Sequence, residues 1–90
     1  MSENPILNFA GFSGADVLAT YVDLPASSRI VFVNRTSGQT FGGVDAAGSG
    51  SATIPPPTGL SAGEYYLKAQ DSTGAYLAQS VVFYIDSAGA

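Results

Sequence analysis

Hydrophobic and polar residues alternate along most of this chain with a period of two, the pattern of β-strands that bury one face. The clearest run is residues 64–70, EYYLKAQ, in which Tyr65, Leu67 and Ala69 share one side of the strand. No stretch repeats its apolar residues with the helical period of 3.6 residues. We therefore expect an all-β protein with these three side chains facing the core.

A turn signal follows this run and joins it to a second strand. In the sequence DSTG, Asp71 suits the first position of a type I turn, and Gly74 supplies the positive φ that closes a three-residue hairpin loop with a bulge. This loop pairs Asp71 with Ala75. Continued along both strands, the pairing predicts buried positions at Leu77, Val81, Phe83 and Ile85. Gln79 falls on the same face, and we interpret this misfit as the mark of a bulge.

A two-residue loop would shift the pairing by one position and bury the other face of the second strand. That face carries Ala78, Ser80, Val82 and Tyr84. Because this set is less apolar, the three-residue loop is the preferred prediction.

The N-terminal half of the chain predicts shorter strands separated by glycine, proline and serine. Residues 6–9 form a candidate edge strand, and residues 16–24 form a strand that stops at Pro25. Residues 29–34 are apolar on both sides, which predicts a central strand covered on at least part of both faces. In these strands we expect five buried residues, namely Leu18, Val22, Leu24, Ile30 and Phe32.

Glycine and proline dominate the middle of the chain. A turn over residues 36–39 leads to a short strand at residues 40–41. Residues 42–50 contain four glycines, which leave little to pack and much backbone entropy to overcome, so we expect a mobile loop there. Residues 51–54 form one more short strand, which the prolines at 55–57 end.

About seven short strands with turn signals between them are typical of an antiparallel β-sandwich. Residues 60–83 resemble the F–G hairpin of bacterial and phage immunoglobulin-like domains, which often read G-x-Y-x-L-x-A-x-D-x-x-G. The matching positions here are Gly63, Tyr65, Leu67, Ala69, Asp71 and Gly74. The resemblance implies an immunoglobulin-like sandwich of about seven strands that spans residues 1–90 as a single domain.

The resemblance also assigns roles to individual residues. It implies that Tyr65 forms a tyrosine corner, with its hydroxyl returning to upstream backbone, and that Leu67 faces the core. The cysteine pair of the family is absent and its strand C tryptophan is replaced by a residue such as Phe32, so an antibody-type domain is not implied. A fibronectin type III sandwich is the alternative.

The amino-acid composition limits the functions that the protein can have. The chain has no cysteine and no histidine, which removes a disulfide framework, most ligands for zinc, iron and copper, and the commonest general base. We therefore expect no enzymatic activity, no cofactor and no metal site. A net charge of −4 with only three cations argues against a nucleic-acid partner. No window approaches the roughly 18 apolar residues of a membrane span, and the N-terminus lacks a signal-peptide pattern.

Two acidic features have a simpler structural explanation. Asp71 supplies a single carboxylate, far short of the about six to eight oxygens that calcium takes, so we interpret it as a turn residue. Asp16, Asp23 and Asp45 are interpreted as solubilising charges at strand ends rather than as a paired-carboxylate site. The prolines at 55–57 are interpreted as a rigid loop rather than as a polyproline docking segment.

The outward face of the predicted hairpin offers a contact surface. Tyr66, Tyr76, Val82 and Tyr84 lie there, and tyrosine is enriched in interfaces and stacks on sugars. Cross-strand packing is the structural alternative. The segments around Phe41 and residues 82–84 also lack the charges that usually protect strand edges. We expect another copy or a larger assembly to cover this surface.

These observations predict a structural or binding module. One class is an accessory or decoration protein of a phage or phage-like particle, which the family resemblance and the missing export signal favour. The other is an adhesion or carbohydrate-binding module from a longer bacterial surface protein, with the tyrosines as contacts. The expected location is a virion or a cell surface. The expected partner is a protein, a second copy of the chain or, in the second class, a glycan.

Overall fold

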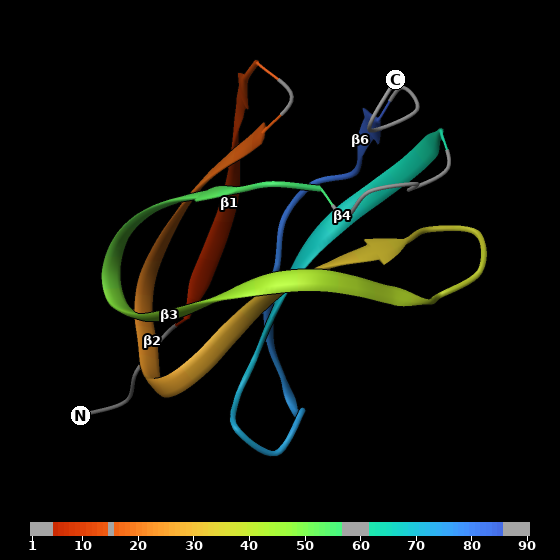
Figure 1. Ribbon diagram of the computed structural model, residues 1–90. Helices are drawn as coiled ribbons and strands as arrows, with labels where there is room; N and C mark the ends of the chain where they lie inside the picture. Colours follow the sequence, from red (N-terminus) through yellow and green to blue (C-terminus); the bar gives the residue numbers. More distant parts are fainter. Residues whose placement is uncertain (1–4, 15, 57–61, 86–90) are drawn as a thin grey trace.

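Six antiparallel strands form one continuous sheet in the computed structural model of the chain, which describes residues 5–14, 16–56 and 62–85 (Figure 1). The strands within these residues are β1 (Ile6–Ser13), β2 (Asp16–Asn34), β3 (Thr40–Ile54), β4 (Gly63–Gln70), β5 (Tyr76–Gln79) and β6 (Phe83–Ile85). The all-β prediction is confirmed. The described part of the chain has six strands in a single curled sheet, where a sandwich of about seven strands was expected.

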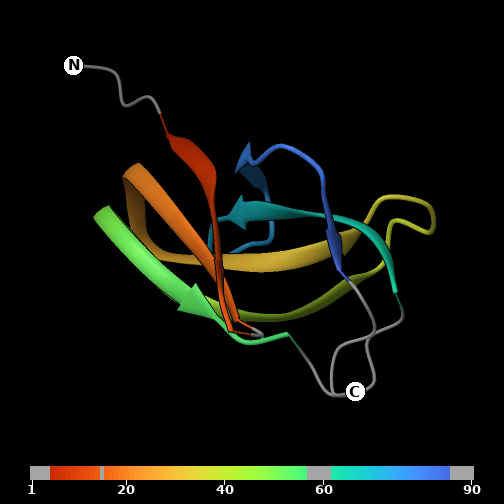
Figure 2. The same ribbon diagram turned by 90° about the horizontal axis from the view of Figure 1, so that it is seen from above.

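β2 joins the two halves of the sheet. Its first part pairs with β1, and its last part, residues 29–34, pairs with β4. β3 runs along the other side of β2 through both parts, while β5 and β6 both pair with β4. Because β2 and β3 bend together, the sheet curls like half a barrel around one core (Figures 1 and 2).

Backbone irregularities produce the bend in β2. Its pairing with β3 shifts at two places within residues 21–28, and Asp23 and Ser27 have positive φ angles of 58° and 65°. The buried Ser28 ties the bend together, because its hydroxyl donates a hydrogen bond of 2.6 Å to the Pro25 carbonyl. Bulges of this kind increase strand twist. Pro25 therefore lies inside a bent strand and does not end it as expected.

The core lies inside the curl. Its largest fully buried apolar side chains are Tyr65, Phe32, Ile30, Ile54, Leu67 and Val17. The predicted burial of Ile30 and Phe32 is confirmed, as is that of the β4 residues Tyr65, Leu67 and Ala69. Val31 and Val33 are buried as well, so the last part of β2 is covered on both faces as predicted.

The first part of β2 buries the face opposite to the one predicted. Val17 and Ala19 are fully buried, whereas Leu18 is only half-buried and Val22 is 39% exposed. Both faces of this strand are apolar, so alternation alone could not choose between them. The irregularity near residue 23 then reverses the alternation, and Leu24 is buried as predicted.

Residues 42–50, expected to be a mobile loop, belong to β3 and pair with β2. Gly43 has a φ of 123°, and a Cβ atom there would lie 2.7 Å from the Ile30 carbonyl oxygen and 2.8 Å from a methyl group of Val31. The absence of a side chain therefore lets the two strands approach closely where their register shifts between Ile30 and Phe32. The glycines shape a bent strand, which is why the segment is not a loop.

The hairpin after β4 begins as predicted. The Asp71 N–H donates to the Ala75 carbonyl at 3.0 Å, the Gly74 N–H donates to the Asp71 carbonyl at 2.9 Å, and Gly74 has a φ of 89°. These contacts confirm the three-residue loop and its glycine. The register then shifts, since Gln70 pairs with Tyr76 but Ala69 pairs with Ala78.

This shift makes Leu77 the extra residue of a bulge and turns Ala78 and Ser80 into the core. The predicted burial of Val81 is wrong, because Val81 is 68% exposed. A second shift precedes β6, where Tyr65 pairs with Phe83. Phe83 and Ile85 are therefore buried as predicted.

An aromatic contact holds β6 in place. The ring of Phe83 stacks on that of Phe9 in β1, with ring centres 4.4 Å apart and an interplanar angle of 13°. Phe12 packs edge-on against Phe9 at 5.3 Å. Such ring pairs add to the free energy gained from apolar burial. They link β1 to β6 across the open side of the curl.

Candidate contact surface

The connection between β5 and β6 is fixed by the buried hydroxyl of Ser80. The Ser80 N–H donates to the Leu67 carbonyl, and Ser80 Oγ accepts a hydrogen bond from the Leu67 N–H, both at 2.9 Å. The same hydroxyl donates to the Val81 carbonyl at 2.9 Å. A side chain thus satisfies a backbone donor where the ladder is interrupted. Because Ser80 points inward, the chain after it can turn Val81 to solvent.

Three of the predicted contact residues meet on the outer face of the sheet. Tyr84 pairs with Glu64, and the same register continued by one residue places Val82 opposite Tyr66. Val82 is 42% exposed, Tyr84 is 56% exposed and Tyr66 is half-buried. Tyr66 pairs in turn with the buried Val33 of β2. We call Val33, Tyr66, Val82 and Tyr84 the outer-face patch.

Tyr76 lies apart from this patch. It is 59% exposed and pairs with Gln70 at the far end of β4. Gln70 lies four positions along β4 from Tyr66, which corresponds to about 13 Å. Lys68 lies between them on the same face. The structure therefore brings three of the four predicted residues together and leaves Tyr76 as an outlying member.

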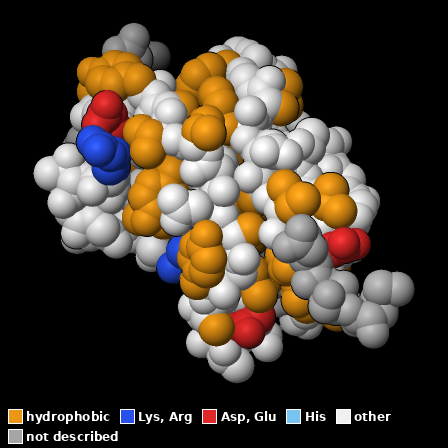
Figure 3. All heavy atoms as spheres, turned by 180° about the vertical axis from the view of Figure 1, so that it is seen from behind, with side chains coloured by type: hydrophobic (Ala, Val, Ile, Leu, Met, Phe, Trp, Pro, Cys, Tyr) orange, Lys and Arg blue, Asp and Glu red, His pale blue; other side chains and the backbone are white. Residues whose placement is uncertain are grey.

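Charged groups border the patch. The Arg35–Glu64 pair lies beside Tyr84, with Arg35 Nη1 2.9 Å from Glu64 Oε1. The Arg29–Asp45 pair, with Arg29 Nη1 2.9 Å from Asp45 Oδ1, lies at the far end of the face, where Arg29 pairs with Gln70. With Lys68, all three cations of the chain lie on or beside this face. Figure 3 shows one face of the molecule, on which hydrophobic side chains form separate groups with acidic and basic side chains among them.

The Asp71 carboxylate serves the turn. Its Oδ1 accepts hydrogen bonds from the Thr73 hydroxyl at 2.7 Å and from the N–H groups of Thr73 and Ala75 at 2.9 and 3.0 Å. These bonds, led by that of the Thr73 hydroxyl, lower the pKa of Asp71. Within residues 5–14, 16–56 and 62–85, no group of three acidic, histidine or cysteine residues could hold a metal ion.

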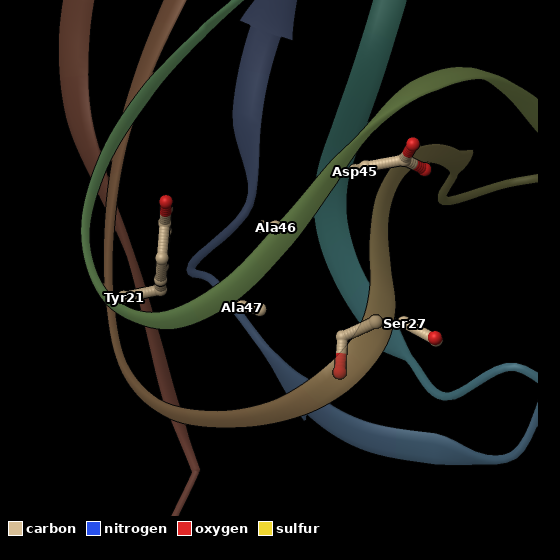
Figure 4. Close-up of a pocket in the computed structure, with 6 residues that line it drawn as sticks. Tyr21, Ser27, Asp45, Ala46 and Ala47 are labelled. Carbon is tan, nitrogen blue, oxygen red and sulfur yellow. The ribbon is translucent and has the colours of Figure 1, made fainter.

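A groove of about 440 Å³ lies at the bend of β2 and β3 (Figure 4). Its lining residues are Tyr21, Ser27, Ser28, Asp45, Ala46 and Ala47. Tyr21 and Asp45 stand at opposite ends of it in Figure 4. The hydroxyl of Ser28 is bonded to Pro25 and the carboxylate of Asp45 to Arg29, so two of its polar groups are already engaged. Sequence patterns could not reveal this groove, because the bend alone assembles it.

Comparison of this chain with protein-family models, with curated proteins and with solved structures gives no match. In the described part of the chain, no helix is long and apolar enough to cross a membrane. The feature that points to a function is therefore the surface itself, and above all the outer-face patch.

Proposed function

We propose that this protein is a non-catalytic structural or binding module that attaches to another protein through the outer-face patch. The observation that carries the proposal is an apolar centre, formed by the half-buried Tyr66 and the exposed Val82 and Tyr84, with charged side chains at its border. Interfaces between proteins have this arrangement, with aromatic residues at the centre and a polar rim. Exposed apolar residues rimmed by polar ones are typical of a surface that a partner covers.

The strand at the edge of the patch supports the same proposal. Residues 76–85 contain no charged side chain, and in the described part of the chain β5 and β6 pair with β4 alone. Natural edge strands that remain exposed usually carry charges that prevent pairing with other chains. Because Arg35 and Arg29 are paired with Glu64 and Asp45, the face carries little net charge, and a neutral partner surface suits it.

The finer form of the proposal is an immunoglobulin-like accessory or decoration protein of a phage or phage-like particle. Its support is the resemblance of residues 60–83 to phage immunoglobulin-like domains, together with the burial of Leu67, the position that this motif assigns to the core. The protein would then reside on the virion, attached to a subunit of the particle.

Attachment can be tested by co-sedimentation. The tagged chain is expressed in the culture that produces the particles, and the particles are banded on a density gradient. The unchanged protein is expected to band with them, and Val82→Lys is expected to remain at the top, because a lysine charge would be desolvated in the interface. Ser72→Lys, on the exposed turn, is the matched control. Equal co-sedimentation of both variants would show that the protein does not attach through the outer-face patch.

A second candidate is a carbohydrate-binding or adhesion module, favoured by the exposure of the rings of Tyr76 and Tyr84. Such rings stack on the apolar faces of sugars. A glycan array separates the two candidates, since the first expects no reproducible hit. A hit that is lost in Tyr84→Ala would favour the second.

Self-association through the patch is a further outcome, visible by light scattering at tens of micromolar and lost in Val82→Lys.

A further inference from the structure

β3 leaves one margin of the sheet open. In the residues that the structure describes, β3 pairs with β2 alone. Figure 2 shows the C-terminal half of β3 at the margin of the sheet, with β2 between it and β1. Unpaired N–H and C=O groups along such a margin are a template for pairing with another chain.

Residues 50–54 are the regular part of this margin. Earlier in β3 the pairing with β2 shifts three times, whereas Gly50 to Ile54 pair without interruption with Tyr21 to Val17. Bulges protect an edge because they break the regular spacing of its backbone groups. Residues 50–54 lack bulges and also lack charge, and Pro55 ends the stretch.

The side chains of this stretch permit close approach. Ser51 and Thr53 are exposed on the outer face, whereas Ala52 and Ile54 point toward the core. Adjacent strands lie about 4.8 Å apart, and small residues fit that spacing without rearrangement. A further strand can therefore add to β3 while the core stays as it is.

We propose that residues 50–54 pair with the same residues of a second copy, antiparallel and about a two-fold axis, so that the two sheets become continuous. In an antiparallel pair, opposite residues point to the same face. A two-fold axis perpendicular to the sheet brings equal faces together. The register that meets both conditions and uses all five residues is the one centred on Ala52.

In this register the stretch is complementary to itself. Ser51 of each copy lies opposite Thr53 of the other, and hydroxyl pairs of this kind stabilise neighbouring strands. Gly50 lies opposite Ile54 and leaves room for it. A second copy suits this edge for an electrostatic reason also, because two chains of net charge −4 repel each other least where neither carries a charge.

The contact is small and the dimer is weak. Five paired residues form about four to six backbone hydrogen bonds. Interfaces well below about 1,200 Å² are typical of weak association. We expect the dimer to form at several hundred micromolar in free solution, and at lower bulk concentration where attachment to an assembly holds copies close together.

A pair of double variants tests both the edge and its register. Ser51→Lys/Thr53→Lys places lysine opposite lysine twice across the axis and should give a monomer at every concentration. Ser51→Lys/Thr53→Glu places lysine opposite glutamate twice and should dimerise at least as well as the unchanged protein. The first variant also lowers the net negative charge, so general repulsion between copies could not explain its loss of dimer.

The measurement is sedimentation velocity from about 10 μM to about 1 mM, with circular dichroism to confirm that each variant is folded. The average mass of the unchanged protein should rise with concentration, and backbone amides of residues 50–54 should become protected from exchange. A monomeric unchanged protein at the highest concentration would overturn the proposal, as would equal dimerisation of both double variants. Val82→Lys should leave this dimer intact, which separates it from attachment through the outer-face patch.

Discussion

Two glycine-containing segments of this protein, the turn after β4 and the strand β3, differ in what sets their shape. In the turn after β4, Gly74 has a positive φ, and the bonds that hold the turn all come from residues within it. Gly43 in β3 also has a positive φ, but the atoms that demand a glycine there belong to Ile30 and Val31 of the neighbouring strand. A glycine-rich stretch can therefore be a turn or a bent strand, and its neighbours decide which.

The largest expected effect comes from the glycine that another strand requires. Gly43→Ala would place a methyl group 2.7 Å from the Ile30 carbonyl oxygen, at a φ of 123° that L-residues rarely adopt. Overpacking and backbone strain together should lower the free energy of unfolding by about 3 kcal/mol. Urea denaturation would measure it.

Gly48→Ala is the matched control for this substitution. Gly48 lies in the same strand with a φ of 70°, but a Cβ atom there meets nothing within 4 Å. Backbone strain alone should cost about 1 kcal/mol. Equal effects of the two substitutions would show that close approach of the strands does not shape β3.

The next effect concerns the connection between β5 and β6, which is also set by a neighbouring strand. Ser80→Ala removes the oxygen that accepts the Leu67 N–H and leaves that buried donor without its partner. The expected loss of stability is about 1 to 3 kcal/mol, with faster hydrogen exchange at the Leu67 amide. Ser72→Ala, on the exposed turn, should change neither quantity. Unchanged hydrogen exchange at the Leu67 amide would contradict the role of the Ser80 hydroxyl as its acceptor.

A smaller effect is expected in the locally determined turn. Gly74 has a φ of 89° with open space around it, so Gly74→Ala should cost about 1 to 2 kcal/mol through strain alone. Gly74→Asn should cost less, because asparagine tolerates the left-handed region. Thermal denaturation of both variants would check this order. A stabilising Gly74→Ala would mean that the turn has a different conformation.

The smallest effect is the pH dependence of the turn. Hydrogen bonds from Thr73 and Ala75 lower the pKa of Asp71 below 3.8, so the unfolded chain takes up the proton more readily than the folded chain. The resulting stability is present above the unfolded pKa and is lost as the pH falls through the folded pKa.

Asp71→Asn keeps an acceptor oxygen in the turn but removes the charge. The unchanged protein should exceed this variant in urea midpoint at pH 7, and the difference should disappear as the pH falls through the folded pKa of Asp71. A difference that persists in acid would mean that the charge of Asp71 does not stabilise the turn.

The outer-face patch shows how a prediction can succeed despite an error in register. The sequence placed Val82 and Tyr84 outward by counting from the turn, and they are outward in the structure. The predicted pairing fails at Leu77 and Val81. One extra residue enters at Leu77, and a second enters between β5 and β6. Two single shifts restore the original alternation, so Phe83 and Ile85 return to the core.

The sequence by itself determined what depends on residues close in the chain. Alternation in residues 64–70 set the buried face of β4, and Asp71 with Gly74 set the turn, because their hydrogen bonds and φ angles need no distant partner. The all-β class follows from the same short-range pattern. The motif also placed Leu67 in the core correctly.

Only the tertiary structure decided the bends, the groove and the open margin of β3. A single inserted residue reverses which face of a strand is buried, and where it enters depends on contacts such as those of Gly43 with β2 and Phe83 with Phe9. The residues around Pro25 and in 42–50 carry turn signals that these contacts override. The two ion pairs Arg29–Asp45 and Arg35–Glu64 likewise join residues that are 16 and 29 positions apart.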